Sequence, residues 1–521
     1  MLKLNFPALL ALATLSGCLW FLAVTPFDLS LLAWLAAVPG LAAIDRAPTW
    51  RQALFLGWWA GVVETAGGFY WLIDVMQRFA EFPWIGAALV FFLFCAARAL
   101  IFLLFAAIAR GVRGRRPVPM TVLAPLAMVV SELVVPQIFP CGQWISQAWQ
   151  PAVIQIAELT GPFGVTALLM MINGALYDLI TRAPHARRLG LGAAALLAAA
   201  LVLGAVRMRE IDAAVARAPK LRVGLVQPNF AYTIDGTFSS REALRQLAAL
   251  QSQSRRLEQS GAELVVWSEG SYPIGLPRDF VADFSGESPA MIRRGLTVPT
   301  LIGAIMIGPH DDAYNSALLL DTAGRETARY DKVQLLAFGE YVPGVETFPW
   351  LRKFLPEGAG RFTAGAAPAL MTLRDSAGQV WKLGPLICYE DILQDYVGHI
   401  GALRPNLLVN LTSDSWFGAT AEPWEHLALS VFASVELRVS MVRAVNSGVS
   451  ALIDPNGRVV RKTYADDPYR NPRAEDGMVV SVPRMAPSRT FYDAAGNLFA
   501  WLCAAATLAL IVIAARTKPS R

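Results

Sequence analysis

Long apolar runs separated by short polar loops dominate the N-terminal part of the chain. About eight runs approach the roughly 20 residues that a helix needs to cross about 30 Å of hydrocarbon, although the second is short enough to be re-entrant. They cover residues 7–25, 28–44, 53–73, 85–109, 118–136, 160–180, 189–206 and 494–515. The pattern predicts an α-helical polytopic bundle, with seven spans within residues 1–212 and one C-terminal transmembrane helix over 494–515.

The segment 220–487 has a different pattern, in which apolar runs of strand length alternate with polar, helix-forming stretches. Strands are predicted at 221–227, 263–269, 300–308, 315–321, 385–391, 405–413 and 477–482. Amphipathic helices are predicted from Ser240 to Gln259 and from His426 to Val445. Because several strands are apolar on both faces, we expect an α/β domain with buried sheet strands.

Composition and charge agree with a membrane protein. The 521 residues are 55% hydrophobic and only 16% charged, whereas a typical soluble domain has about 25% charged residues. The net charge is +5, but much of the positive charge lies in short loops, so no nucleic-acid partner is expected. Every second loop or terminus is basic, through Lys3, Arg46, Arg51, Arg110, Arg113, Arg115, Arg116, Arg182, Arg187, Arg188, Arg516, Lys518 and Arg521. This alternation predicts that both termini are cytoplasmic and that 220–487 faces the other side, the periplasm of a bacterium.

Cysteine usage leaves one residue of chemical interest. Of the five cysteines, Cys388 alone belongs to the polar middle of the chain. An odd count without close spacing argues against a disulfide scaffold and against a zinc site built from cysteines. Cys388 is then either a buried inert thiol or a nucleophile, and taken by itself it favours the inert thiol.

Charged residues end several of the apolar strands, where α/β folds place reacting groups. Glu269 ends one strand, Glu390 follows Cys388 on another, and Lys332 and Glu340 lie in the segment 330–343. A free thiol has a pKa of about 8.5 and is little ionised at neutral pH. A carboxylate that takes its proton and an ammonium that stabilises an oxyanion would complete an acyl-transfer site without histidine. Singly, such a Glu is commonly a solvated rim residue and such a Lys a surface ion pair, so the interpretation depends on their joint occurrence.

The motifs that carry these residues resemble those of a known superfamily. WSEGSYP, YDKVQLLAFGEYVP and PLICYED resemble the Glu, Lys and Cys motifs of the nitrilase (carbon–nitrogen hydrolase) superfamily. With the spans around them, the chain resembles the bacterial apolipoprotein N-acyltransferases over nearly its full length, and AELTGPFGV, VQPN, YNSALL, SDSWFG, EPWEH and RAVNSGVSALIDPNG agree. The resemblance implies a nitrilase-like αββα sandwich domain on the outer face of a membrane bundle.

The resemblance also implies an activity. Members of this family transfer an acyl chain from a membrane glycerophospholipid to the N-terminal amine of a diacylglyceryl-cysteine lipoprotein, by a ping-pong mechanism through a thioester. Carried over by motif, Cys388 is the nucleophile, Glu269 the general base and Lys332 the oxyanion partner. Glu340 would assist Glu269 and position Lys332. No cofactor and no metal is expected.

Further residues are implicated less directly. Tyr389 would supply a backbone N–H to the oxyanion, and Glu390 would hold the nucleophile loop. Since both substrates are amphiphiles, the segment from Tyr341 to Phe362 is interpreted as a lid that dips into the membrane interface, or else as a packed loop. Residues expected to contact substrate are Trp350, Trp416, Phe417, Asn315 and His426, with core packing as the alternative for Trp416 and Phe417.

Two departures from the family pattern and two other functions stay open. Where the family has a Trp after the first strand, the nearest aromatic residues are Phe230 and Tyr232, and Ser413 replaces the family's Asn before the Asp of SDSWFG. The first alternative function is a membrane-tethered carbon–nitrogen hydrolase, or amidase, acting on a lipid-like amide. The second is a non-catalytic membrane scaffold, against which the intact Glu, Lys and Cys set speaks.

Overall fold

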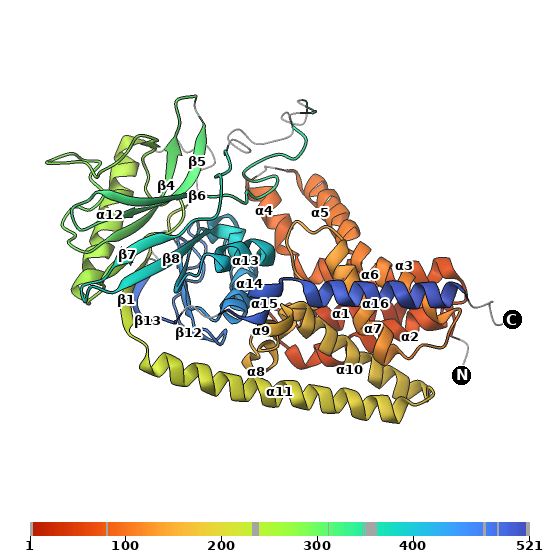
Figure 1. Cartoon of the computed structure of the whole chain (residues 1–521). Coiled ribbons are helices and arrows are strands. Elements are labelled where there is room, and N and C mark those ends of the chain that lie inside the picture. Colours follow the sequence, from red (N-terminus) through yellow and green to blue (C-terminus); the bar gives the residue numbers. More distant parts are fainter. Residues whose placement is uncertain are drawn as a thin grey trace. The chain divides into compact units, whose positions relative to one another are not determined.

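The chain folds into two compact units (Figure 1). This computed structural model describes residues 4–79, 82–231, 239–310, 312–345, 347–348, 350, 362–471, 476–486 and 489–516. The helical unit comprises Met1–Asp74, Phe82–Arg209 and Thr490–Arg521, and the sheet unit comprises Val75–Glu81 and Glu210–Arg489.

The helical unit is built from apolar helices that pack on one another, many of them far apart in the sequence. Its main helices are α1 (Phe6–Leu22), α2 (Ala37–Arg46), α3 (Trp50–Gly68), α5 (Trp84–Arg98), α6 (Leu100–Arg113), α7 (Met120–Val134), α10 (Phe163–Thr181), α11 (Ala186–Arg217) and α16 (Leu498–Ala515). Shorter elements are η1 (Ser30–Trp34), α4 (Trp71–Phe79), η2 (Gln143–Gln147), α8 (Pro151–Ile154), α9 (Ala157–Thr160) and α15 (Phe491–Ala495). The first helix starts where sequence rules place it, because the Asn5 side chain caps the backbone N–H of Ala8 and a proline occupies the first turn.

Among the described residues, four helices are long and apolar enough to cross a membrane. They are Trp84–Arg113, Phe163–Thr181, Ala186–Arg217 and Leu498–Ala515. The predicted number of about eight spans is therefore not confirmed. The second predicted span, 28–44, forms the short η1 and the ten-residue α2, while α1 and α7 are apolar but have only 17 and 15 residues.

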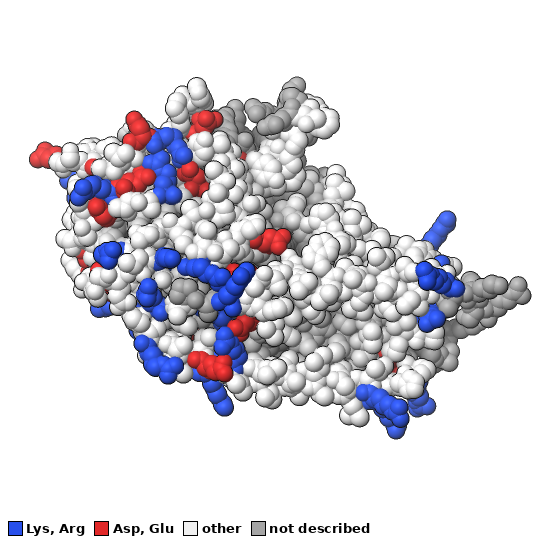
Figure 2. Space-filling model, in the orientation of Figure 1, with Lys and Arg blue, Asp and Glu red and all other residues white. Residues whose placement is uncertain are grey.

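The basic loops of the helical unit meet at one end. Asp45, at the end of α2, accepts a hydrogen bond from Arg113 at 2.9 Å and from the Tyr177 hydroxyl at 2.7 Å, so the ends of α2, α6 and α10 converge. Figure 2 shows Lys and Arg gathered at the end of this unit near the chain termini, with largely uncharged flanks. This is the distribution that orients membrane bundles.

Two sheets form the centre of the other unit. The first has the order β13-β1-β2-β4-β5-β6 with β3 beside β4, and the second has the order β12-β11-β10-β9-β8-β7. Strands of the first are β1 (Lys220–Gln227), β2 (Leu264–Val266), β3 (Leu276–Pro277), β4 (Thr300–Ile307), β5 (Ala313–Leu320), β6 (Glu326–Asp331) and β13 (Asp476–Pro483). Strands of the second are β7 (Met371–Arg374), β8 (Val380–Ile387), β9 (Leu407–Thr412), β10 (Met441–Val445), β11 (Ala451–Ile453) and β12 (Val459–Lys462). In each sheet three central strands are parallel, β1-β2-β4 and β8-β9-β10.

Helices cover the outer faces of the two sheets. The sheets contact each other through β1 and β10 and through β5 and β8. Helix α12 (Ser240–Gln259) packs on the first sheet, where Leu247 and Leu250 join a core with Val265 and Trp267. Helices α13 (Gln394–Ala402) and α14 (Glu422–Leu437) lie on the other side of the second sheet (Figure 1). The αββα sandwich expected from the resemblance is confirmed.

Most predicted elements of this unit are confirmed, with one correction. The seven predicted strands correspond to β1, β2, β4, β5, β8, β9 and β13, and α12 has the predicted bounds. The helix predicted from His426 to Val445 is wrong beyond Leu437. There Arg438 adopts a left-handed conformation that ends α14, and residues 441–445 form β10. Since β10 is buried along its whole length, its apolar pattern resembles that of a buried helix.

Candidate active site

Strand ends position the residues of the candidate active site. Cys388 directly follows β8, Lys332 directly follows β6, and Glu269 lies just beyond the end of β2. The structure brings these three residues together with Glu340. The Lys332 Nζ lies 3.6 Å from Glu269 Oε1 and 2.7 Å from Glu340 Oε2, and the Cys388 thiol is close enough to Glu269 for each group to shift the pKa of the other.

The backbone turns sharply at Cys388. Its φ is +54°, a left-handed conformation that is uncommon outside glycine and costs on the order of 1–3 kcal/mol. The Asn410 side chain donates a hydrogen bond to the Cys388 carbonyl oxygen at 2.9 Å, which helps to hold the turn. The short helix η4 (Cys388–Ile392) begins at this residue, so the thiol is at the tip of a strand-to-helix turn and keeps partial exposure.

Glu390 joins the nucleophile turn to the lysine loop. Its Oε1 accepts hydrogen bonds from the backbone N–H groups of Val333 and Gln334 at 2.8 and 2.9 Å. Its Oε2 accepts from the backbone N–H of Ile387 at 2.7 Å, and the Tyr330 hydroxyl donates to the same carboxylate. The side chain is fully buried. One carboxylate thereby connects the residues just after Lys332 with the residue just before Cys388.

Asn315, which was expected to contact substrate, lies between two carboxylates of the site. From β5, its Nδ2 donates to Glu269 Oε1 at 2.7 Å and to Glu340 Oε1 at 3.1 Å. The other Glu340 oxygen accepts from the backbone N–H of Leu336 at 2.9 Å as well as pairing with Lys332. The amide therefore bridges the two carboxylates. An amide placed by a strand among carboxylates has no motif of its own, and the only sequence signal was its inclusion in YNSALL.

Burial and mutual charge shift the titration of the central groups. Burial raises the pKa of Glu269, and Glu340 adds to this rise while Lys332 opposes it. Burial acts to lower the pKa of Lys332, but the negative charges of Glu340, Cys388 and Glu269 outweigh it and raise that pKa well above its ordinary value. The pKa of the Cys388 thiol is also raised well above its usual range, by burial and by Glu269. The resting site therefore holds a neutral thiol beside an ammonium group.

This arrangement suits nucleophilic attack with proton transfer. A neutral thiol gains nucleophilicity when an adjacent base removes its proton during attack. Glu269 lies beside the thiol, and its raised pKa makes it a stronger base than an ordinary carboxylate. Lys332, which is only 1% exposed, is a fixed cation with which a developing negative charge can pair.

The aromatic residues expected at the substrate are placed as follows. Trp416 ends η5 (Asp414–Trp416) and Phe417 follows it, just after β9, the strand that pairs in parallel with β8. Both keep partial exposure. Trp350 is 56% exposed, and its ring centroid lies 6.5 Å from that of the equally exposed Phe348. Residues 351–361 of the predicted lid lie outside the described residues, as does Tyr232.

His426 belongs to a different buried cluster. Its Nε2 lies 3.0 Å from Asp391 Oδ1 and its Nδ1 lies 3.1 Å from Asp414 Oδ1. The side chain is only 5% exposed. Both ring nitrogens thus have carboxylate partners from the protein, which does not match the expected contact with substrate.

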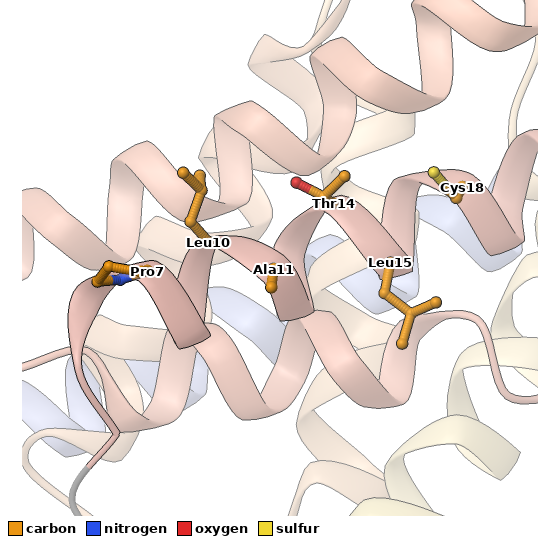
Figure 3. A pocket seen from close by; sticks show the side chains of 6 residues that line it. All are labelled: Pro7, Leu10, Ala11, Thr14, Leu15 and Cys18. Carbon is orange, nitrogen blue, oxygen red and sulfur yellow. The ribbon is translucent and has the colours of Figure 1, made fainter.

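A groove on the helical unit contains none of the predicted site residues. It has a volume of about 520 Å³ and lies along α1, lined by Pro7, Leu10, Ala11, Thr14, Leu15 and Cys18 (Figure 3). Its lining is almost entirely apolar. It offers no charged group for chemistry.

Comparison with known families agrees with the fold and the motifs. Residues 222–467 match the carbon–nitrogen hydrolase family. This places the sheet unit, with its Glu, Lys and Cys, in the carbon–nitrogen hydrolase superfamily. Residues 16–175 match the apolipoprotein N-acyltransferase N-terminal domain.

Full-length relatives identify the family more closely. The chain is 32% identical to the apolipoprotein N-acyltransferase of Allorhizobium ampelinum, over 87% of this chain and 86% of the relative. It is 29% identical to that of Geobacter metallireducens, over 97% of this chain and 95% of the relative. The chain therefore belongs to the apolipoprotein N-acyltransferase family and is an N-acyltransferase. Among solved structures, Saccharomyces cerevisiae Nit3, a nitrilase-superfamily member, is 15% identical with a TM-score of 0.36, over 51% of this chain and 90% of that chain.

Proposed function

We propose that the protein transfers an acyl chain from a membrane glycerophospholipid to the N-terminal amine of a diacylglyceryl-cysteine lipoprotein, through a thioester on Cys388. One observation carries this proposal. The Lys332 ammonium group lies 3.6 Å from the Glu269 carboxylate, and the Cys388 thiol is close enough to both groups to shift their pKa values. A nucleophile, a base and a cation thus meet at one site.

In the first half-reaction the Cys388 sulfur attacks the ester carbonyl of the phospholipid while Glu269 takes the thiol proton. The oxyanion that forms is stabilised by Lys332 and by the backbone N–H of Tyr389. The carbon–oxygen bond then breaks, Glu269 returns the proton to the leaving oxygen, and a lysophospholipid departs. The product is an acyl-thioester, with Glu269 again ionised.

In the second half-reaction the amine of the lipoprotein attacks the thioester carbonyl. Glu269 takes a proton from the amine, the carbon–sulfur bond breaks, and the proton passes to the Cys388 sulfur. The amide product leaves with the acyl chain. A thioester suits this task because amines attack it readily, and exclusion of water from the site prevents its hydrolysis.

Three further residues keep the reacting groups in place. Glu340 holds Lys332 at 2.7 Å and supports Glu269 through the amide of Asn315. Glu390 fixes the nucleophile turn. In this scheme Trp350, Trp416 and Phe417 contact the lipid substrates, since exposed aromatic side chains favour the membrane interface.

The placement in the membrane follows from charge. Residues 1–212 and 494–515 would form the transmembrane part of a bacterial inner-membrane protein, and 220–487 the catalytic domain. The basic loops at one end of the helical unit support a cytoplasmic location for that end and for both termini. The catalytic domain is then periplasmic, where lipoprotein substrates are exposed after export.

A transfer assay tests the proposal. Full-length protein in lipid nanodiscs is given labelled phospholipid and a synthetic peptide that begins with diacylglyceryl-cysteine. Mass spectrometry of the peptide should show one added acyl chain, and Cys388→Ser should show none. If wild-type protein released free fatty acid and left the peptide unchanged, the amidase-like alternative would replace transfer. If neither product formed, the scaffold alternative would hold.

A further inference from the structure

A second cluster of ligating side chains lies where the second sheet meets α14, and the proposed acyl transfer does not use it. Asp414 begins η5 just after β9, while Glu422 and His426 lie one turn apart on α14. One ligating atom from each residue can be chosen so that all three lie within 4.8 Å of one another. All three side chains are buried. A carboxylate and an imidazole four residues apart on a helix project from the same face.

The spacing of the ligating atoms fits a single small cation. His426 Nδ1 lies 3.1 Å from Asp414 Oδ1 and 3.9 Å from Glu422 Oε1. Two ligands at about 2.0–2.1 Å from a zinc ion, separated by a tetrahedral angle, lie about 3.3 Å apart. The two observed distances lie on either side of this value.

Two buried carboxylate oxygens in the cluster lack a partner. Asp414 Oδ2 and Glu422 Oε2 have no hydrogen bond from any described residue, although their residues are only 1% and 8% exposed. Burying a charged oxygen without a partner is unfavourable by several kcal/mol. Gly448 packs against Asp414 Oδ2, where an added Cβ would lie 2.6 Å away. A cation bound by the two carboxylates would reduce the cost of burying them.

The neighbours of His426 have the arrangement of the outer shell of a metal site. Asp391 Oδ1 lies 3.0 Å from His426 Nε2 and can accept a hydrogen bond from the N–H at that position. Asp391 is held in turn by the Ser430 hydroxyl at 2.8 Å and by an ion pair with Arg443. A metal-bound histidine commonly donates its other N–H to a carboxylate, which fixes the tautomer that leaves a lone pair for the metal. Since Arg443 pairs with Asp391, the carboxyl groups of Asp414 and Glu422 have no guanidinium or ammonium partner among the described residues.

We infer that Asp414, Glu422 and His426 form a binding site for one divalent first-row transition-metal ion, with zinc as the best fit. One imidazole nitrogen and two carboxylate oxygens, with a water as fourth ligand, are a suitable set for Zn²⁺, and Mn²⁺ is the nearest competitor. The site departs from the expectation that no metal is needed. Its role is structural. It ties the end of β9 to α14 and, through Asp391, to the short helix η4 that begins at Cys388.

Metal content and thermal stability test the site independently of acyl transfer. Full-length, tag-free protein in detergent is stripped with EDTA, dialysed, and then titrated with ZnCl₂ and separately with MnCl₂. Wild-type protein should retain one zinc per chain by elemental analysis, and zinc should raise its thermal midpoint. Glu422→Gln should retain no zinc and show no such rise. Glu436→Gln, which alters another buried carboxylate of α14, should behave as wild type.

Two results would overturn the inference. One is stripped wild-type protein that takes up neither zinc nor manganese, in which case His426 is a cation that bridges Asp391 and Asp414 without metal. The other is Glu422→Gln protein that binds as much zinc as wild type. If Glu422→Gln does not fold, cobalt-loaded wild-type protein decides, because a four-coordinate Co²⁺ site gives intense visible absorption bands and their absence contradicts the site. Failure of acyl transfer would leave each of these readouts unchanged.

Discussion

Glu390 offers the sharpest test of how the site is held together. Replacing it by Gln keeps its size but exchanges one carboxylate oxygen for an amide nitrogen. If the remaining oxygen keeps the N–H groups of Val333 and Gln334, the new NH₂ faces the N–H of Ile387, which loses its acceptor. A buried N–H left without a partner costs about 1–3 kcal/mol. We therefore expect Glu390→Gln to be less stable than wild type under acidic conditions.

The same substitution removes one contribution to the pH dependence of folding stability. Burial raises the pKa of Glu390 from its ordinary 4.5 to about 7, so the folded protein holds this proton more tightly than the unfolded chain. The resulting stabilisation is complete below about pH 4.5 and is lost as the pH rises through about 7. At roughly 1.4 kcal/mol for each unit of difference between the folded and unfolded pKa, this stabilisation amounts to about 3 kcal/mol. The glutamine variant does not titrate, so its deficit relative to wild type should shrink as the pH rises.

Thermal unfolding of detergent-solubilised protein measures this deficit. Midpoints of wild type and Glu390→Gln are compared from about pH 5 to about pH 8, because the expected loss falls within this window. Glu242→Gln is the control, since it weakens an i,i+3 ion pair with Arg245 on the surface of α12, worth about 0–1 kcal/mol, and alters one hydrogen bond from Gln246. The deficit of Glu390→Gln should be largest at the acidic end. A deficit that stayed constant or grew with pH would refute the assigned role of the buried carboxylate.

Other predictions follow from the contacts of the site. Glu269→Gln should not form a thioester from phospholipid, because no base takes the Cys388 proton; normal acyl-enzyme in intact-mass spectra would exclude Glu269 as the base. Asn315→Ala should slow turnover by about 10–100-fold. It should also move the acidic limb of the pH–rate profile to higher pH, because the Asn315 hydrogen bond lowers the pKa of Glu269. An acidic limb at the wild-type pH would contradict this. Trp350→Ala should raise the apparent KM for vesicle phospholipid with little change in kcat; an unchanged KM would remove Trp350 from lipid binding.

The sequence was informative where a local pattern determines the structure. Buried strands such as β4 and β9 are continuous apolar runs, and α12 has a helical period with a serine cap at Ser239. The strand-end positions of Glu269 and Cys388 followed directly from these patterns. Since strand ends meet at one edge of a sheet, the candidate site could be predicted before its geometry was known.

The remaining features depend on contacts between distant segments. Asn315 was predicted to contact substrate, but its bridge to Glu269 and Glu340 could not be predicted, because it exists only where β5 lies beside two loops. The link between His426 and Asp391 joins positions 35 residues apart. The number of spans could not be counted from hydropathy alone, because an apolar run such as 28–44 can form a broken, short helix. Pairing of this kind has no signature in a single sequence.

Formation of the acyl-enzyme tests the central claim most directly. Full-length protein is mixed with phospholipid that carries a labelled acyl chain, without an acceptor, and is then analysed by intact mass and by peptide mapping. Our account predicts one labelled chain per molecule, attached to Cys388, released by hydroxylamine and by an acceptor amine. A labelled chain on another residue, or product formation with no acyl-enzyme at any time, would contradict it.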